Sequence, residues 1–177
     1  TRARADDRNL PRIPAARLHL IHNGVDAVVD ATHPYADQMS VHAVAACRQT
    51  GAHLVSLVRA PWTRAQGDVW VGVGSTGEAV HALGSAPRRV FLGIGRQELH
   101  VFANAPQHHY LARVIEPPPR ESLPPAVTLI RARGPFDLAA ETSLLCDGRI
   151  DVVVAKNAGG KATYAKIEGA RALGLPV

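Results

Sequence analysis

The chain has 177 residues, of which 46% are hydrophobic and 20% are charged, as expected for one or two globular domains and unlike a disordered chain. No apolar run is long enough to cross a bilayer, and no apolar stretch near the N-terminus is typical of a secretory signal. We therefore expect a cytoplasmic protein with no membrane partner. The net charge of +5 predicts anionic partners without saying which kind.

Composition also disfavours two kinds of site. A nucleic-acid partner is not expected, because the basic residues are scattered and aromatic residues make up only 5% of the chain, too few for stacking platforms in a basic groove. A metal is not expected, since Cys47 and Cys146 have no partner at metal-ligand spacing. The phosphates of a nucleotide, or a substrate with many carboxylates, explain the basic balance equally well.

Short apolar runs alternate along the chain with polar or glycine-rich turns and with amphipathic stretches. Continuous β-branched runs are typical of parallel strands buried on both faces, and their alternation with helices predicts an α/β fold with parallel sheets. In chain order we expect strands at 27–30, 54–59, 90–92, 110–114, 127–132 and 152–155. We expect three helices that end near residues 49, 83 and 102, a fourth that contains Glu141, and a fifth over 163–173.

The stretch 84–87, Gly-Ser-Ala-Pro, interrupts this pattern and predicts a linker between two modules. We accordingly expect an N-terminal α/β module over 1–85 and a C-terminal α/β module over 86–177. In open parallel sheets the strand-to-helix turns meet at the carboxyl edge, where ligands bind. The candidate site residues are therefore sought in those turns.

The turn at 30–36 reads Asp-Ala-Thr-His-Pro-Tyr-Ala and follows a strand of the buried type. Thr32, His33 and Tyr35 supply hydrogen-bond donors, acceptors and a group that titrates near neutral pH. Alternatively, Thr32 or His33 only caps the next helix, with Pro34 at its first position. The residues alone leave both interpretations open.

The turn at 156–161 reads Lys-Asn-Ala-Gly-Gly-Lys and lies between a buried-type strand and a helix. Adjacent glycines allow close approach of a ligand to the backbone, and a helix N-terminus attracts anions. The turn is similar to a phosphate-binding loop but not to a Walker A loop, because Ala162 rather than Ser or Thr follows Lys161. A glycine turn needed only for backbone geometry is the alternative.

Two arginines follow other strands. Arg96 lies in Gly-Ile-Gly-Arg-Gln at 93–97, and Arg133 lies in Ala-Arg-Gly-Pro-Phe at 132–136. Either guanidinium suits bidentate binding of a carboxylate or phosphate, while simple solvation is the alternative. The chain has no Gly-x-Ser-x-Gly nucleophile elbow and no pair of histidines at metal spacing on one helix face.

Five strings, in order, resemble the precorrin-6A reductase family of cobalamin (corrin) biosynthesis. They lie at 30–36, at 59–62 with 67–70, at 91–97, at 132–136 and at 156–160, and the resemblance extends from about residue 25 to residue 177. The string at 30–36 is similar to the family's most characteristic motif. One string is weak evidence, whereas five collinear strings are specific.

The resemblance implies two Rossmann-like domains with the active site in the cleft between them, and NADPH-dependent reduction of precorrin-6A to precorrin-6B. The substrate would be a small-molecule tetrapyrrole whose many carboxylates suit the basic balance. The reaction also needs a proton, from His33, Tyr35 or solvent. The residues expected to bind NADPH are Thr32, His33, Lys156, Asn157, Gly159 and Gly160, and those expected to bind the substrate are Arg96, Arg133 and Lys161.

The chain departs from the family pattern at both ends. Family members open with a strand that leads into Gly-Gly-Thr and continue past Leu-Pro-Val, whereas here no Gly-Gly-Thr precedes residue 30 and the sequence stops at Val177. Each module is therefore expected to lack a segment. A non-catalytic nucleotide- or tetrapyrrole-binding remnant of the family and a reductase of cobalt-precorrin-6A are the alternatives, and a monomer is the expected state.

Overall fold

The computed structural model describes residues 25–177 and divides the chain into two compact units, one up to Ala60 and one from Pro61 to Val177. Each unit contains a parallel sheet with helices, so the predicted α/β class is confirmed. Residues 1–24, where the family's opening strand is expected to be missing, lie outside the described residues.

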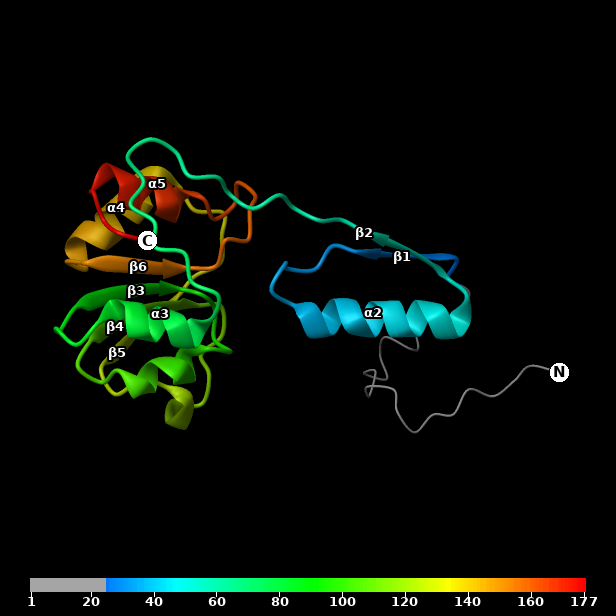
Figure 1. Ribbon diagram of the computed structural model, residues 1–177, viewed down its shortest axis with the longest axis horizontal. Coiled ribbons are helices and arrows are strands. Elements are labelled where there is room, and N and C mark those ends of the chain that lie inside the picture. The colour runs from blue at the N-terminus through cyan, green and yellow to red at the C-terminus, as the bar shows by residue number, and fades with distance from the viewer. Residues whose placement is uncertain (1–24) are drawn as a thin grey trace. The chain divides into compact units, whose positions relative to one another are not determined.

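The N-terminal unit holds two parallel strands and one helix (Figure 1). Its elements are β1 (Ala27–Asp30), α2 (Asp37–Thr50) and β2 (His53–Ser56). The strands pair in register from Ala27 opposite His53 to Asp30 opposite Ser56. Because both strands are parallel, the turn that follows Asp30 lies at the carboxyl edge of this sheet.

The C-terminal unit contains a four-stranded parallel sheet in the order β5-β4-β3-β6. Its strands are β3 (Arg89–Gly93), β4 (His109–Val114), β5 (Val127–Arg131) and β6 (Val152–Ala155). The central run Val90–Leu92 is fully buried, as expected for a strand covered on both faces. The predicted strands therefore form one sheet, with β3 and β6 as neighbours despite their separation in sequence.

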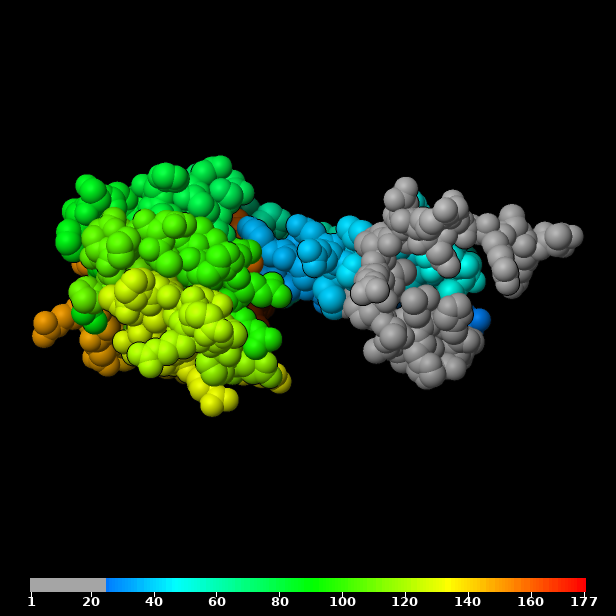
Figure 2. Space-filling view, turned by 90° about the horizontal axis from the view of Figure 1, so that it is seen from below, coloured from blue at the N-terminus to red at the C-terminus, as the bar shows by residue number. Residues whose placement is uncertain are grey.

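Helices cover both faces of this sheet (Figure 1). One face packs against α3 (Thr76–Leu83) and the 3-10 helix η2 (Leu99–Asn104), and the other against α4 (Leu138–Asp147) and α5 (Ala165–Ala172). The short 3-10 helix η3 (Arg120–Ser122) follows the three prolines of the β4–β5 loop. Figure 2 shows the surface of the C-terminal unit from below, where the green and yellow-green part of the chain lies on the outside.

Two extended segments continue the C-terminal sheet beyond β6. The amide of Val153 donates to the carbonyl of Pro176 at 2.9 Å, and the amide of Val177 donates to the carbonyl of Val69 at 2.8 Å. The amide of Val71 then donates to the carbonyl of Val177 at 2.8 Å. The residues just before α3 are thereby hydrogen-bonded to the edge of the C-terminal sheet.

The boundary between the compact units differs from the predicted one near residue 85. Ala79 and Leu83 of α3 are buried in the same hydrophobic cluster as Val90 and Leu92 of β3, so α3 belongs to the C-terminal unit. The 84–87 stretch is a tight connection inside that unit, and the division falls between Ala60 and Pro61. Glycine and proline mark a turn but do not reveal which core the preceding helix joins.

Candidate functional site

The strand order of the C-terminal sheet creates a topological switch point. The chain runs outward from β3 to β4 and β5 and then returns to place β6 on the other side of β3. Ligands of open α/β sheets bind at the carboxyl ends of the two strands where the order reverses. Those strands end at Gly93 and Ala155, which lie opposite each other in register. The turns at 93–97 and 156–160 thus meet at the edge of the sheet.

Lys156, predicted to bind a ligand, lies directly after β6 at this edge. Its Nζ donates to Glu98 Oε1 at 2.8 Å, and the hydroxyl of Thr76 donates to the other carboxylate oxygen. Although burial opposes it, these bonds hold the pKa of Glu98 below its ordinary value. Glu98 therefore joins the β3 turn, the β6 turn and the start of α3 in one charged cluster. Sequence reasoning missed Glu98.

Asn157 follows Lys156, and its carboxamide is hydrogen-bonded on both sides to one residue. Its Oδ1 accepts from the backbone amide of Trp62 at 2.6 Å, and its Nδ2 donates to the backbone carbonyl of Trp62 at 3.0 Å. The indole Nε1 of Trp62 donates to the carbonyl of Gly160 at 2.8 Å. Trp62 lies 95 residues before Asn157 in the sequence, which is why the spacing of residues gave no sign of this contact.

Gly159 and Gly160 form the sharp part of the turn, with φ angles of 66° and 79°. Only glycine adopts such angles without strain at two successive positions. Within residues 25–177, the backbone amides of Gly159, Gly160 and Lys161 donate to no acceptor. Unpaired amides before a helix bind anions readily, so this turn has the donors that a phosphate or carboxylate requires.

The three side chains predicted to contact a polyanionic substrate lie after three different strands. Arg96 follows β3 and pairs with Glu116, Nη1 to Oε2 at 3.0 Å, and both side chains are largely exposed. Arg133 follows β5 and Lys161 follows β6, and both are exposed. An exposed ion pair contributes little to stability, so Arg96 can exchange Glu116 for another carboxylate at low cost.

A buried charged cluster lies beneath the same edge, and sequence reasoning missed it. Arg113 of β4 donates to both carboxylate oxygens of Glu141, at 3.0 and 2.5 Å, and stacks 3.9 Å from the centre of the Phe136 ring. Lys166 of α5 is 5% exposed, donates to the carbonyl of Thr163 at 2.7 Å and lies 4.8 Å from the centre of the Trp62 ring. Burial lowers the pKa of Lys166 to about 8.

In the N-terminal unit, the turn after β1 is organised by Asp30. This buried carboxylate accepts from the backbone amide of Thr32 at 3.1 Å and from its hydroxyl at 2.7 Å. The hydroxyl of Thr32 also lies 3.4 Å from that of Ser40. Thr32 is thus fixed at the carboxyl edge of β1, the predicted position.

His33 and Tyr35 lie in the same turn and are both exposed. The backbone amide of Tyr35 donates to Nδ1 of His33 at 3.3 Å, and the two rings lie 5.9 Å apart. Helix α2 begins at Asp37 with Ala36 as its N-cap, and no side chain caps it. The alternative in which Thr32 or His33 caps the helix is therefore wrong, and Pro34 lies in the turn rather than in the first helical position.

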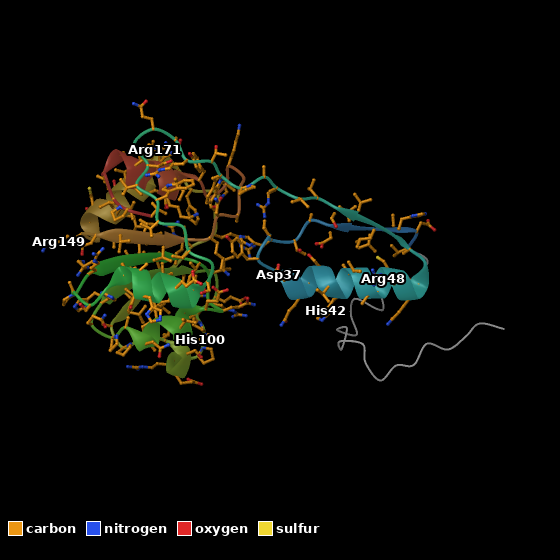
Figure 3. All side chains as sticks on the ribbon, in the orientation of Figure 1. Asp37, His42, Arg48, His100, Arg149 and Arg171 are labelled. Carbon is orange, nitrogen blue, oxygen red and sulfur yellow. The ribbon has the colours of Figure 1, made fainter. Side chains whose placement is uncertain are left out.

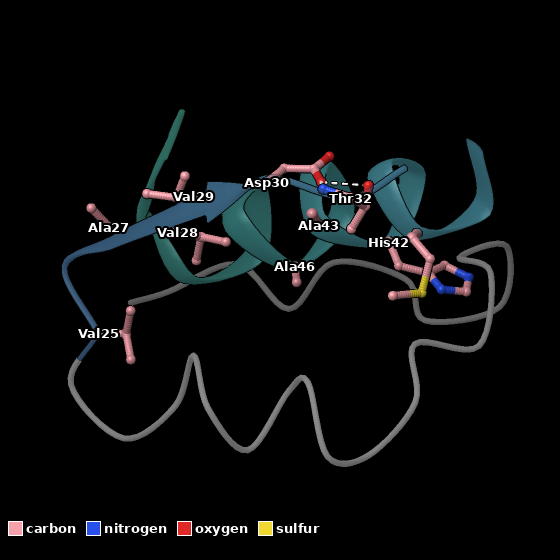
Figure 4. A pocket seen from close by; sticks show the side chains of 10 residues that line it. Val25, Ala27, Val28, Val29, Asp30, Thr32, His42, Ala43 and Ala46 are labelled. Atoms are coloured by element: carbon pink, nitrogen blue, oxygen red, sulfur yellow. Dashed lines mark hydrogen bonds between the residues drawn. The ribbon is translucent and has the colours of Figure 1, made fainter. Parts of the chain in front are cut away.

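A cavity of about 360 Å³ lies against β1 and α2 (Figure 4). Asp30 and Thr32 line one end, while Met39, His42 and Ala46 contribute from successive turns of the helix. Sequence reasoning did not select His42, although its spacing of three residues from Met39 and four from Ala46 places all three on one helix face. The cavity joins the polar turn to an otherwise apolar surface.

The described part of the chain has neither a metal-binding cluster nor a membrane-spanning helix. Between residues 25 and 177, no group of three or more His, Cys, Asp or Glu side chains is arranged to hold a metal ion. No helix in that range is long and apolar enough to cross a membrane.

Comparison with known proteins identifies the family. The family model described as "Precorrin-6x reductase CbiJ/CobK" matches residues 13–177. The chain belongs to this family. The resemblance to the precorrin-6A reductase family that the sequence shows is therefore confirmed, and the match covers both the turn after β1 and the turn after β6.

Relatives that bear the name precorrin-6A reductase are similar over most of this chain. The precorrin-6A reductase of Rhodobacter capsulatus is 52% identical over 159 residues, which cover 90% of this chain and 63% of the relative. The precorrin-6A reductase of a Sinorhizobium species is 48% identical, covering 90% and 61%. A solved structure titled "CobK precorrin-6A reductase" matches with a TM-score of 0.84 at 52% identity, covering 90% of this chain and 65% of that one. The chain thus spans less than two thirds of each relative.

Proposed function

We propose that the protein reduces precorrin-6A to precorrin-6B with NADPH as the hydride donor. The observation that carries this proposal is the match of the CbiJ/CobK family model along nearly the whole chain. Relatives that bear the name precorrin-6A reductase are up to 52% identical. Each unit, taken by itself, has a parallel sheet with a polar turn at its carboxyl edge, and such a turn suits the binding of a nucleotide or another anionic ligand.

The geometry supports a division of tasks among the predicted residues. Unpaired amides at Gly159 and Gly160, next to Lys156, suit a phosphate of the cofactor. Thr32 and His33 are the corresponding candidates after β1. The exposed side chains of Arg96, Arg133 and Lys161 suit the carboxylates of a tetrapyrrole.

The chemistry divides between the cofactor and the protein. Bound NADPH supplies the hydride, and the chain's task is to hold its ligands in place and to deliver a proton. Nδ1 of His33 accepts from the amide of Tyr35, so Nε2 is the imidazole nitrogen that can carry a proton toward a ligand. The phenol of Tyr35 and solvent remain the other two candidate donors.

The cofactor proposal is tested by titrating the protein with NADPH and with NADH and following cofactor fluorescence. We expect NADPH to bind about 10 to 100 times more tightly, since a charge-assisted contact to its extra phosphate is worth roughly 1.5 to 3 kcal/mol. Consumption of NADPH upon addition of precorrin-6A then tests the reaction. Equal affinity for the two cofactors contradicts phosphate selectivity, and tight binding without turnover supports the non-catalytic alternative.

A further inference from the structure

Trp62 contacts four residues of the β6–α5 turn and of helix α5. Its backbone amide and carbonyl are both bonded to the Asn157 side chain, and its indole Nε1 donates to the carbonyl of Gly160. Nζ of Lys166 lies over the Trp62 ring, 4.8 Å from the ring centroid, and the centroids of the Trp62 and Tyr164 rings are 5.5 Å apart. One residue of an extended segment thus contacts both ends of the glycine turn and the helix that follows it.

A second anchor lies six residues further along the same segment. The carboxylate of Asp68 is 6% exposed and accepts from Nε of Arg171 at 2.8 Å. Although burial opposes it, the bond from Arg171 holds the pKa of Asp68 below its ordinary value. Arg171 also donates to the hydroxyl of Tyr164 at 2.7 Å, and Figure 3 shows it on α5 beside the extended segment. Residues 62–68, which we call the strap, are therefore fastened at both ends.

The backbone of Trp62 fixes the orientation of the Asn157 side chain. It uses one of the two lone pairs of Oδ1 and one of the two N–H donors of Nδ2, so the carboxamide is held toward the strap. A ligand could reach only the remaining lone pair and the remaining N–H, in the orientation that these two bonds impose. By contrast, the backbone amides of Gly159 and Gly160 have no acceptor in the described part of the chain. In the same turn, these amides are therefore the groups that suit an anionic ligand.

We propose that Trp62 is a positioning residue for the Gly159–Gly160 turn, and that Asn157 holds Trp62 in place instead of contacting a ligand. Asn157 fixes the strap backbone, the Trp62 indole fixes the carbonyl of Gly160, and the peptide that follows this carbonyl carries the Lys161 amide. The inference rests on the proposed function only for the choice of NADPH as the probe.

Three variants separate this role from direct binding. Asn157→Ala removes both bonds to the strap backbone. Trp62→Phe keeps an aromatic ring on Lys166 and removes only the bond to Gly160. Trp70→Phe is the matched control, because Nε1 of Trp70 is buried and has no partner among residues 25–177, so that no hydrogen bond is lost. Circular dichroism verifies that each variant folds.

The first measurement uses the free protein. We expect the amide resonances of Gly160 and Lys161 to shift in Asn157→Ala and in Trp62→Phe but not in Trp70→Phe. The Trp62 amide should exchange its hydrogen about tenfold faster in Asn157→Ala, since its acceptor is gone. Unmoved glycine-turn resonances in both variants overturn the proposal.

The second measurement is the NADPH dissociation constant from cofactor fluorescence. We expect Asn157→Ala and Trp62→Phe each to raise the dissociation constant about five- to tenfold, the equivalent of one net hydrogen bond. Because both changes break the same chain of contacts, the dissociation constant of the double variant should be no higher than the higher of the two single-variant values. Weaker binding in Asn157→Ala with Trp62→Phe unchanged shows direct contact and overturns the proposal. Absence of NADPH binding in the wild type overturns the proposed cofactor, while the free-protein resonances still decide the role of Trp62.

Discussion

At the scale of single residues, Lys166 is a charged side chain in a buried environment that lysine ordinarily avoids. It is 5% exposed and shares the interior with Arg113 and Glu141. One carboxylate faces two cations, so the cluster carries a net positive charge away from water. Burying an incompletely compensated charge destabilises a fold, and such sites are enriched near ligands.

The lowered pKa of Lys166 makes a signed prediction about stability and pH. Below about pH 8 the lysine is charged in both the folded and the unfolded states, so the folded state bears the full cost of burial. Between about 8 and 10.5 only the unfolded chain binds the proton, so the free energy of unfolding contributed by this group rises with pH.

Replacing this lysine by methionine therefore stabilises the protein more at neutral than at alkaline pH. We expect Lys166→Met to raise the free energy of unfolding by up to about 3 kcal/mol at pH 7, at about 1.4 kcal/mol per pKa unit, and by much less at pH 10. Urea denaturation of both proteins at the two pH values measures this. A constant difference between wild type and variant across the range contradicts the assignment.

His33 is the residue whose predicted role is tested by separating activity from stability. Because no side chain caps α2, His33→Ala should leave the thermal midpoint within a degree or two of the wild type. Loss of a general acid typically lowers turnover by about 100-fold or more. NADPH oxidation with precorrin-6A, compared with Tyr35→Phe as the parallel variant, shows which side chain supplies the proton. Unchanged turnover in both variants indicates solvent as the donor.

The sequence identified residues next to strand ends and missed residues that meet across the fold. Lys156 and Thr32 were found because each follows an apolar run that predicts a parallel strand, and ligand-binding turns follow the carboxyl ends of such strands. Trp62 and Glu98 were missed because their partners are 95 and 58 residues away. Local periodicity carries no information about such pairs.

At the scale of elements, the hydrogen bonds at a helix start follow the local sequence only in part. The Ser75 hydroxyl accepts from the amide of Glu78 at 3.1 Å, which is one half of a capping box, while the Glu78 carboxylate accepts from Gly74 instead of Ser75. The predicted helix toward Phe102 is a 3-10 helix. Both deviations concern backbone geometry within one turn, which residue preferences constrain weakly.

The junction between α4 and β6 depends on Gly148. A Cβ at this position would lie 2.9 Å from the backbone carbonyl oxygen of Leu144 and 3.1 Å from the side chain of Leu111. Gly148→Ala should therefore destabilise the protein by about 1 to 3 kcal/mol through overpacking, measured by thermal or urea denaturation.

Gly77→Ala is the matched control for this effect. Gly77 lies in α3, and the nearest atom to its added Cβ is the Ser75 hydroxyl oxygen at 3.8 Å. Alanine there should stabilise the helix by up to about 1 kcal/mol. Equal losses in the two variants would mean that close approach at Gly148 is not the cause.

At the scale of the whole molecule, the fold class followed from the sequence and the division into units did not. Continuous apolar runs such as Val90–Leu92 and Val152–Ala155 alternate along the chain with helical stretches. They predict parallel strands, and the structure confirms these strands. The boundary was misplaced because α3 carries its own caps and looks independent. Helix α3 belongs to the C-terminal unit because Ala79 and Leu83 pack against strands that come later in the chain.

Two fragments test the boundary. A fragment of residues 61–177 keeps α3 and the strap and should unfold in one cooperative transition. A fragment of residues 86–177 loses Ala79 and Leu83 from the core, together with the segment at 69–71 that pairs with Val177. Burial of a large aliphatic side chain contributes about 2 to 3 kcal/mol, so the shorter fragment should unfold at a lower urea concentration or not fold at all. Equal stabilities would place the boundary near residue 85 after all.

The strap also bears on the order in which the C-terminal unit is completed during synthesis. Trp62 leaves the ribosome 95 residues before Asn157, and at about 5 to 20 residues per second this is a wait of roughly 5 to 20 seconds. During that interval its indole has none of its final partners, because all of them lie at or beyond residue 157. The first segment of this unit to be translated is thus among the last to be secured, and a nascent chain arrested before the β6–α5 turn would still expose it.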